Sequence, residues 1–164
     1  MDIAAASADC EIVITRTIAA PRERVWDAWT TPEHLAHWWG PNGFTITTHE
    51  FAFTVGGVWR FMMHGPDGRD YPNHIVFTEI KKPERISNDH GADDGKVHFR
   101  ATVTFEEEAG PPGQTGRTGQ TKVTMRSVFP SREERDRVIE EHGAIEGGKQ
   151  TLSRLDDYVA GIRS

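Results

Sequence analysis

Hydrophobic positions near the end of the chain, over residues 144–162, repeat at helical spacing. Two sets of residues, each spaced by seven positions, form this stripe: Ile145, Leu152 and Val159, and Gly148, Leu155 and Ile162. Charged side chains occupy the opposite side: Lys149, Arg154, Asp156 and Asp157. The pattern predicts one long amphipathic helix whose apolar side packs against the rest of the protein.

One position in this stripe, Gly148, is a glycine. Glycine inside a helix costs about 1 kcal/mol relative to alanine, so its presence on the buried side needs a reason. Either a strand approaches the helix closely, or space is left for a molecule that is not protein. Because the neighbouring stripe positions are large, we favour a cavity between the helix and the strands that carry residues 59–63 and 71–77.

Alternation of apolar and polar residues predicts strands before this helix. Their expected ranges are 11–18, 44–54, 58–64, 73–80, 85–90, 96–105 and 121–129. Two short helices should follow the first strand, one beginning near Pro21 and one near Pro32 with Thr31 as its N-cap. A further charged helix over 131–142 begins with the capping box Ser131-x-x-Glu134.

Two segments carry few residues that could pack. Residues 106–120 are rich in glycine and proline, which predicts a long mobile hairpin loop. Deleting most of residues 107–120 should therefore change stability little, because loop closure depends only logarithmically on length. We expect residues 1–9 to be a flexible N-terminus and residues 10–164 to form a single domain.

This order of elements predicts an α+β fold. A curved antiparallel sheet of about seven strands must bury one face, and the last helix is the long element able to cover it. We expect a helix-grip architecture, in which the sheet wraps around the C-terminal helix without closing on it completely. A central cavity should then lie between sheet and helix.

Composition narrows the classes of function. The 164 residues carry a net charge of −6, which argues against nucleic-acid binding through phosphate contacts. The single cysteine fits a reducing compartment, and the N-terminus lacks the pattern of a secretory signal. No stretch of eighteen apolar residues predicts a membrane span. We therefore expect a soluble cytoplasmic protein; a homodimer and a monomer are both compatible with the sequence.

Three segments resemble a known group of proteins: residues 20–44, 56–86 and 143–159. They are similar to the START-like, birch-pollen-allergen-like (SRPBCC) helix-grip superfamily, and most similar to its branch related to the activator of the heat-shock protein 90 ATPase. The resemblance implies a cavity for a small apolar or aromatic molecule. Similar proteins often carry a large aromatic residue at the position of Gly148, so the cavity volume does not transfer to this chain.

The candidate ligand-binding residues are aromatic, soft or polar side chains on the elements that should line this cavity. They are Trp38, Trp39, Trp59, Phe61, Met63, Tyr71, Asn73, Phe77, Phe99, Met125, Gly148 and Leu152. For Trp26 and Trp29 helical spacing alone favours a core position. Trp59, Phe61 and Met63 are as compatible with a core role as with a ligand role.

Four polar side chains surround the turn at residues 65–70: His64, Tyr71, Asn73 and His74. In a functional interpretation Tyr71 and Asn73 bind a carbonyl or hydroxyl group, and His64 is an acid or base. Turn chemistry with exposed histidines is the simpler explanation. Because residues 71–80 are apolar on both faces, periodicity does not show which face points inward.

We assign no catalytic residue, cofactor or metal site. His34 and His37 are three residues apart, but no carboxylate or cysteine completes a set at ligand spacing. We favour a small-molecule binding protein. An enzyme of the cyclase or dehydratase type would need inward-facing His64 or His74 beside a carboxylate. A co-chaperone-like module, with a chaperone as partner, would show an exposed apolar patch and a filled interior.

Overall fold

A computed structural model of the chain describes residues 10–91, 97–108 and 119–161. The elements follow in the order β1 Glu11–Ile18, α1 Arg22–Thr30, α2 Pro32–Trp38, β2 Thr45–Phe51, β3 Val58–His64, β4 Asp70–Lys81, β5 Arg85–Gly91, β6 Val97–Glu108, β7 Gln120–Val128, α3 Arg132–His142 and α4 Ala144–Gly161. No helix in these ranges is both long and apolar enough to cross a membrane.

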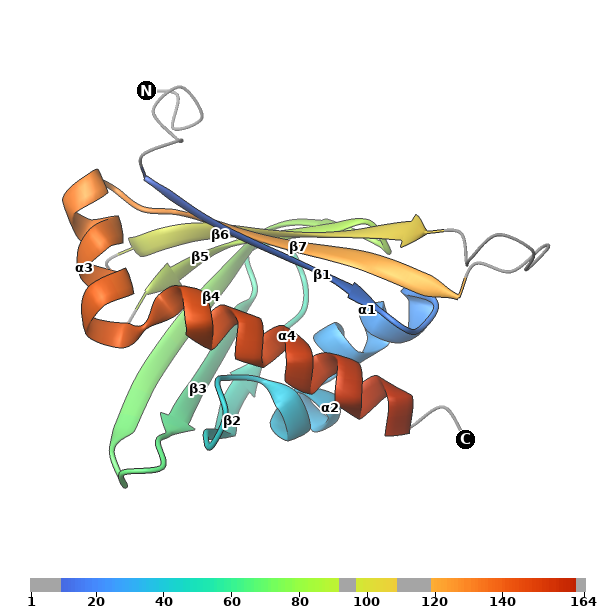
Figure 1. The fold of residues 1–164 in the computed structure, drawn as a ribbon, viewed down its shortest axis with the longest axis horizontal. Coiled ribbons are helices and arrows are strands. Elements are labelled where there is room, and N and C mark those ends of the chain that lie inside the picture. Colours follow the sequence, from blue (N-terminus) through green and yellow to red (C-terminus); the bar gives the residue numbers. More distant parts are fainter. Residues whose placement is uncertain (1–9, 92–96, 109–118, 162–164) are drawn as a thin grey trace.

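The strands form one antiparallel sheet in the order β1-β7-β6-β5-β4-β3-β2. Register shifts interrupt the pairing of β2 with β3, of β4 with β5 and of β5 with β6. Bulges of this kind bend strands and increase their twist. The sheet accordingly curves, and α4 lies across its concave side (Figure 1). This α+β helix-grip fold confirms the architecture predicted from the sequence.

The core lies between α4, α1 and α2 on one side and the sheet on the other. Leu152, Leu155 and Val159 of α4 are fully buried, as the stripe predicts, and Trp26 and Trp29 of α1 are core residues. Ile145 is an exception and is 39% exposed. It lies in the first turn of α4, directly after Gly143, where the backbone has a left-handed conformation. The predicted apolar stripe therefore begins to pack one turn later than its sequence suggests.

Gly148 packs closely against β1, so the prediction that it borders a cavity is wrong. A Cβ atom at Gly148 would lie 2.2 Å from Cδ1 of Ile14 and 3.6 Å from Cε of Met125. The δ-methyl group of Ile14 fills the space that a side chain at Gly148 would need. Large neighbours in the stripe did not reveal this contact, because the residue that requires the glycine lies on another element.

The predicted ends of several elements also need correction. Residues 106–108 continue β6 and pair with residues 120–122 of β7, so the predicted loop over 106–120 is shorter at both ends. Residues 109–118 and 1–9, for which we predicted mobility, lie outside the described residues. Thr31 makes no side-chain capping hydrogen bond, whereas Oγ of Ser131 accepts one from the backbone N–H of Glu134 at 3.1 Å.

Candidate functional site

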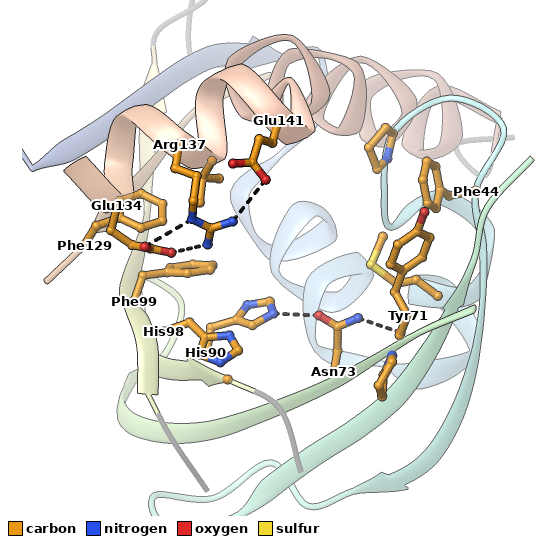
Figure 2. A pocket seen from close by; sticks show the side chains of 15 residues that line it. Phe44, Tyr71, Asn73, His90, His98, Phe99, Phe129, Glu134, Arg137 and Glu141 are labelled. Carbon is orange, nitrogen blue, oxygen red and sulfur yellow. Dashed lines mark hydrogen bonds and ion pairs between the residues drawn. The ribbon is translucent and has the colours of Figure 1, made fainter. Parts of the chain in front are cut away.

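A cavity of about 750 Å³ lies at one end of the sheet, between strands β3 to β6 and helix α3. Figure 2 shows its side chains pointing toward one another from the sheet, from the segment after α2 and from α3. The lining residues are Pro41, Phe44, Met63, Tyr71, Pro72, Asn73, His90, Gly91, His98, Phe99, Phe129, Glu134, Arg137, Val138 and Glu141. The cavity is thus beside α3 and not beneath α4, where we expected it.

Aromatic rings form two sides of this cavity. Phe44 and Tyr71 lie on one side with their ring centroids 6.0 Å apart, and Phe99 and Phe129 lie on the other with centroids 5.0 Å apart. Phe129 is 5% exposed, so its ring is fixed within the core. Met63 adds a flexible thioether beside Phe44 and Tyr71. These groups offer a planar apolar molecule extensive contact area.

A chain of hydrogen bonds crosses the floor of the cavity (Figure 2). Nδ2 of Asn73 donates to the backbone carbonyl of Tyr71 at 3.0 Å, which identifies the other amide atom as the oxygen. Nε2 of His90 lies 2.8 Å from that oxygen, Oδ1 of Asn73. Since an amide oxygen can only accept, Nε2 of His90 must carry the hydrogen. Nδ1 of the neutral ring then holds a lone pair and acts as an acceptor.

His90 is neutral at physiological pH. Desolvation by the surrounding protein, with smaller effects of His98 and His74, lowers the pKa of His90 to about 4 from its ordinary 6.5. The ring also stacks on Phe99, with centroids 4.6 Å apart and planes inclined by 27°. The imidazole thus contacts an aromatic ring and an amide. Neither is a carboxylate, which would favour the charged form of the ring.

A register shift explains why His98 also lines the cavity. His90 pairs with Phe99, but Gly91 pairs with Val97, so His98 is an additional residue in β6 at this point. A bulge changes the direction in which the additional side chain points. Strict alternation would have placed His98 on the face opposite Phe99, yet both line the cavity.

Helix α3 supplies a charged side to the cavity, opposite His90 and Asn73 (Figure 2). Arg137 forms ion pairs with Glu134, three residues before it, and with Glu141, four residues after it at 3.4 Å. Hydrogen bonding to Arg137 lowers the pKa of Glu134 and raises that of Arg137. Two carboxylates around one guanidinium give this cluster a net negative charge, so it does not favour an anionic ligand.

Arg154 of α4 holds the segment that contributes Pro41 and Phe44. Its Nη1 donates to the carbonyl oxygens of Gly40 at 2.8 Å and of Pro41 at 2.9 Å. Burial lowers the pKa of Arg154. The sequence pattern placed Arg154 on the polar side of the helix, and the structure shows that this half-buried side chain fastens α4 to the wall of the cavity.

Four of the predicted ligand-binding residues line the cavity: Met63, Tyr71, Asn73 and Phe99. Others belong to the buried core, namely Trp38, Trp59, Phe61, Phe77 and Leu152. Trp39 and Met125 are partly buried and pack against that core, and Gly148 contacts Ile14. Trp59 and Phe61 stack on each other with centroids 4.1 Å apart, which explains why alternate positions on β3 are aromatic.

The polar group around the β3–β4 turn does not converge. Tyr71 and Asn73 share the inward face of β4 with the buried Ile75 and Phe77, which settles the direction of this strand. His64 instead forms an exposed pair with Asp70, at 2.7 Å, and contacts Oγ1 of Thr47. The predicted role of His64 as an acid or base in the cavity is therefore wrong, because it follows Met63 and points to the opposite face.

Sequence reasoning missed the histidine at the floor and the whole of the α3 side. His90 lies on β5, whose alternating pattern is weak in the sequence. The available indication was that His90 shares a strand face with Ile86 and Asn88, which are buried. Nothing in the sequence of α3 indicated which elements it would face. Among the described residues, no group of three or more His, Cys, Asp or Glu side chains is placed to hold a metal ion.

Solved structures of other proteins have a similar fold. A protein from Arthrobacter aurescens is 28% identical with a TM-score of 0.78, and the match covers 98% of this chain and 90% of the other. A protein from Mycobacterium smegmatis is 25% identical with a TM-score of 0.79, covering 94% of each chain. A Nitrosomonas europaea protein, 22% identical over 95% of this chain and 97% of its own, shares the fold with a TM-score of 0.80.

A search of curated proteins finds no match. The model of one protein family, described as Activator of Hsp90 ATPase homolog 1-like protein, matches residues 19–160. That span runs from the end of β1 through nearly all of α4 and contains every residue that lines the cavity. The chain therefore belongs to the Activator of Hsp90 ATPase homolog 1-like family.

Proposed function

We propose that the protein binds a small apolar or aromatic molecule in the cavity beside α3. The observation that carries this proposal is the lining itself: about 750 Å³ of space between aromatic side chains, with one neutral imidazole at its floor. Ligand sites in proteins have volumes of about 300–1,000 Å³ and combine apolar walls with a few placed polar groups.

Binding is favoured over catalysis by the surroundings of His90. A general base at neutral pH works best with a pKa near 7, whereas burial lowers the pKa of His90 to about 4. Its hydrogen-bond partner is the amide of Asn73 and not a carboxylate. His64 has a carboxylate partner, Asp70, but this pair is exposed on the opposite face of the sheet.

The exposed apolar side chains do not favour a docking surface for a chaperone. In the described part of the chain the large ones are Val13, Val55, Val97 and Ile145, which lie on β1, the β2–β3 connection, β6 and α4. Single exposed hydrophobic residues are usual on protein surfaces and need no partner to explain them. We therefore propose a ligand and not a protein partner for this chain.

The proposal is tested with a neutral fluorescent probe, N-phenyl-1-naphthylamine, titrated into the protein. The wild-type chain should bind it, and Val138→Trp, which places a large ring in the cavity wall, should weaken binding by at least about tenfold. Val13→Trp is the matched control, because Val13 is exposed on β1 and away from the cavity. Native mass spectrometry of protein from its own host would identify a retained ligand.

Absence of probe binding to the wild-type protein would contradict the proposal, as would equal losses in Val138→Trp and Val13→Trp. Circular dichroism of both variants separates a blocked cavity from a disturbed fold.

A further inference from the structure

We infer that the ligand of this cavity is an aromatic molecule that carries a hydrogen-bond donor, a hydroxyl or N–H group, which it gives to Nδ1 of His90. This inference rests on the proposed function and names the chemistry that the cavity selects. Its basis is the direction of the hydrogen bonds at the cavity floor.

That direction is fixed from the backbone upward. The carbonyl of Tyr71 accepts from Nδ2 of Asn73, Oδ1 of Asn73 accepts from Nε2 of His90, and Nδ1 of His90 is left as an acceptor. Among the described residues no hydrogen bond to Nδ1 is found, and Nδ1 is not one of the fully buried polar atoms that lack a partner. The tautomer is thus set by the neighbouring amide, as the partner of one ring nitrogen commonly determines the state of the other.

The second observation concerns Asn88, two residues before His90 on the same strand. It alternates with Ile86 and His90 toward the concave side of the sheet and is 9% exposed. Its Oδ1 has no hydrogen-bond partner in the described part of the chain. Buried amide oxygens are nearly always paired, so this one is an unsatisfied acceptor on the same strand as His90, although Asn88 itself does not line the cavity.

The cavity therefore presents the acceptor Nδ1 of His90 at the floor and aromatic rings at the sides. Phe99 stacks on His90, so an aromatic ligand that lies along Phe99 and Phe129 brings its edge toward the imidazole. A hydroxyl group at that edge satisfies Nδ1, whereas a methoxy or carbonyl group displaces solvent from Nδ1 and leaves it unpaired. The net negative cluster on α3 favours the neutral form of such a ligand over its anion.

A matched pair of ligands separates this inference from the proposed function. Isothermal titration of the wild-type protein at pH 7 with 2-naphthol and 2-methoxynaphthalene compares two molecules that differ in one donor hydrogen. Both should bind, and 2-naphthol should bind about tenfold more tightly, the usual cost of an unpaired buried acceptor. If both bind with equal affinity, or the methoxy compound binds better, this inference is overturned and the proposed function stands. If neither binds, both fail.

Two substitutions of Asn73 test whether the tautomer is responsible. Asn73→Gln keeps an uncharged amide oxygen as acceptor for Nε2–H, so the preference for 2-naphthol should persist. Asn73→Leu removes that acceptor and lets the ring hydrogen move to Nδ1, so the preference should fall to about twofold or less. An unchanged preference in Asn73→Leu would overturn the assignment of Nδ1. The wild-type comparison decides the main point even if either variant fails to fold.

Discussion

The contact between Gly148 and Ile14 makes a quantitative prediction about stability. In Gly148→Ala the new Cβ would lie 2.2 Å from Cδ1 of Ile14, far below any normal contact distance. Ile14 is 8% exposed, so its δ-methyl group has to rotate away within a largely buried environment. Overpacking of this kind costs about 1–3 kcal/mol, while helix propensity returns about 1 kcal/mol. We expect a net loss of about 1 kcal/mol.

A double-mutant cycle identifies the atom responsible. Ile14→Val removes Cδ1, and the next neighbours of a Cβ at Gly148 are then at ordinary distances of 3.5 and 3.6 Å. In that background Gly148→Ala should stabilise the protein by about 1 kcal/mol, because only the propensity gain remains. The two backgrounds thus differ by about 2 kcal/mol, well above the deviation expected for independent sites.

Urea unfolding of the four proteins provides the free energies of unfolding. Gly147→Ala is a control for helix propensity, since its Cβ meets only Pro41, at 3.3 Å, a contact that a slight shift relieves. Probe binding should be unchanged in Gly148→Ala, because Gly148 does not line the cavity. Equal stabilisation by Gly148→Ala in both backgrounds would refute the close-packing explanation.

Three further predictions concern the site. The pKa of His90 is about 4 in the folded protein and 6.5 in the unfolded chain, so acidification protonates the unfolded chain first. Between pH 7 and pH 4 the free energy of unfolding should therefore fall by about 3 kcal/mol more in the wild type than in His90→Gln. Parallel pH profiles of the two proteins in urea unfolding would contradict this. Arg154→Met should destabilise the protein by about 2 kcal/mol, because charged hydrogen bonds to the carbonyls of Gly40 and Pro41 are lost. Arg154→Lys should retain part of this stability, and thermal denaturation of both variants measures the difference. Asn88→Leu should raise stability by about 1 kcal/mol through removal of an unpaired buried oxygen; a loss of stability in urea unfolding would show that the amide is satisfied.

The fold could be predicted from the sequence because each helix and strand is indicated by a local pattern of residues. The apolar stripe that includes Leu152 and Val159, the alternation along β6 and the capping box at Ser131 each depend on residues close in the chain. These signals gave the order of elements, and the order admits few architectures. The curved sheet and its grip on the last helix were expected from that order, and the family resemblance agreed with them.

The site could be predicted only in part, because it depends on contacts between distant segments. Periodicity showed that Tyr71 and Asn73 share a face of β4, but which face is inward was decided by packing of Ile75 and Phe77. His98 reaches the cavity through a bulge that no local pattern indicates. The error at Gly148 has the same origin, since the residue that excludes a side chain there lies 134 positions earlier in the chain.

Helix α3 has a consequence for the rate at which a ligand can enter. Arg137 of this helix pairs with Glu134 and Glu141, also on α3, whereas Arg135 donates to the backbone carbonyl of Glu11 in β1 at 3.1 Å. The apolar contact of α3 comes from the half-buried Val138 and Ile139. We expect α3 to detach more readily than α4 or the sheet, because fewer core contacts would break. The rate of ligand association would then be limited by the opening of α3. Amide hydrogen exchange in α3 would report how often the helix opens. A tight ligand should slow this exchange and leave slowly exchanging amides of the central strands unaffected.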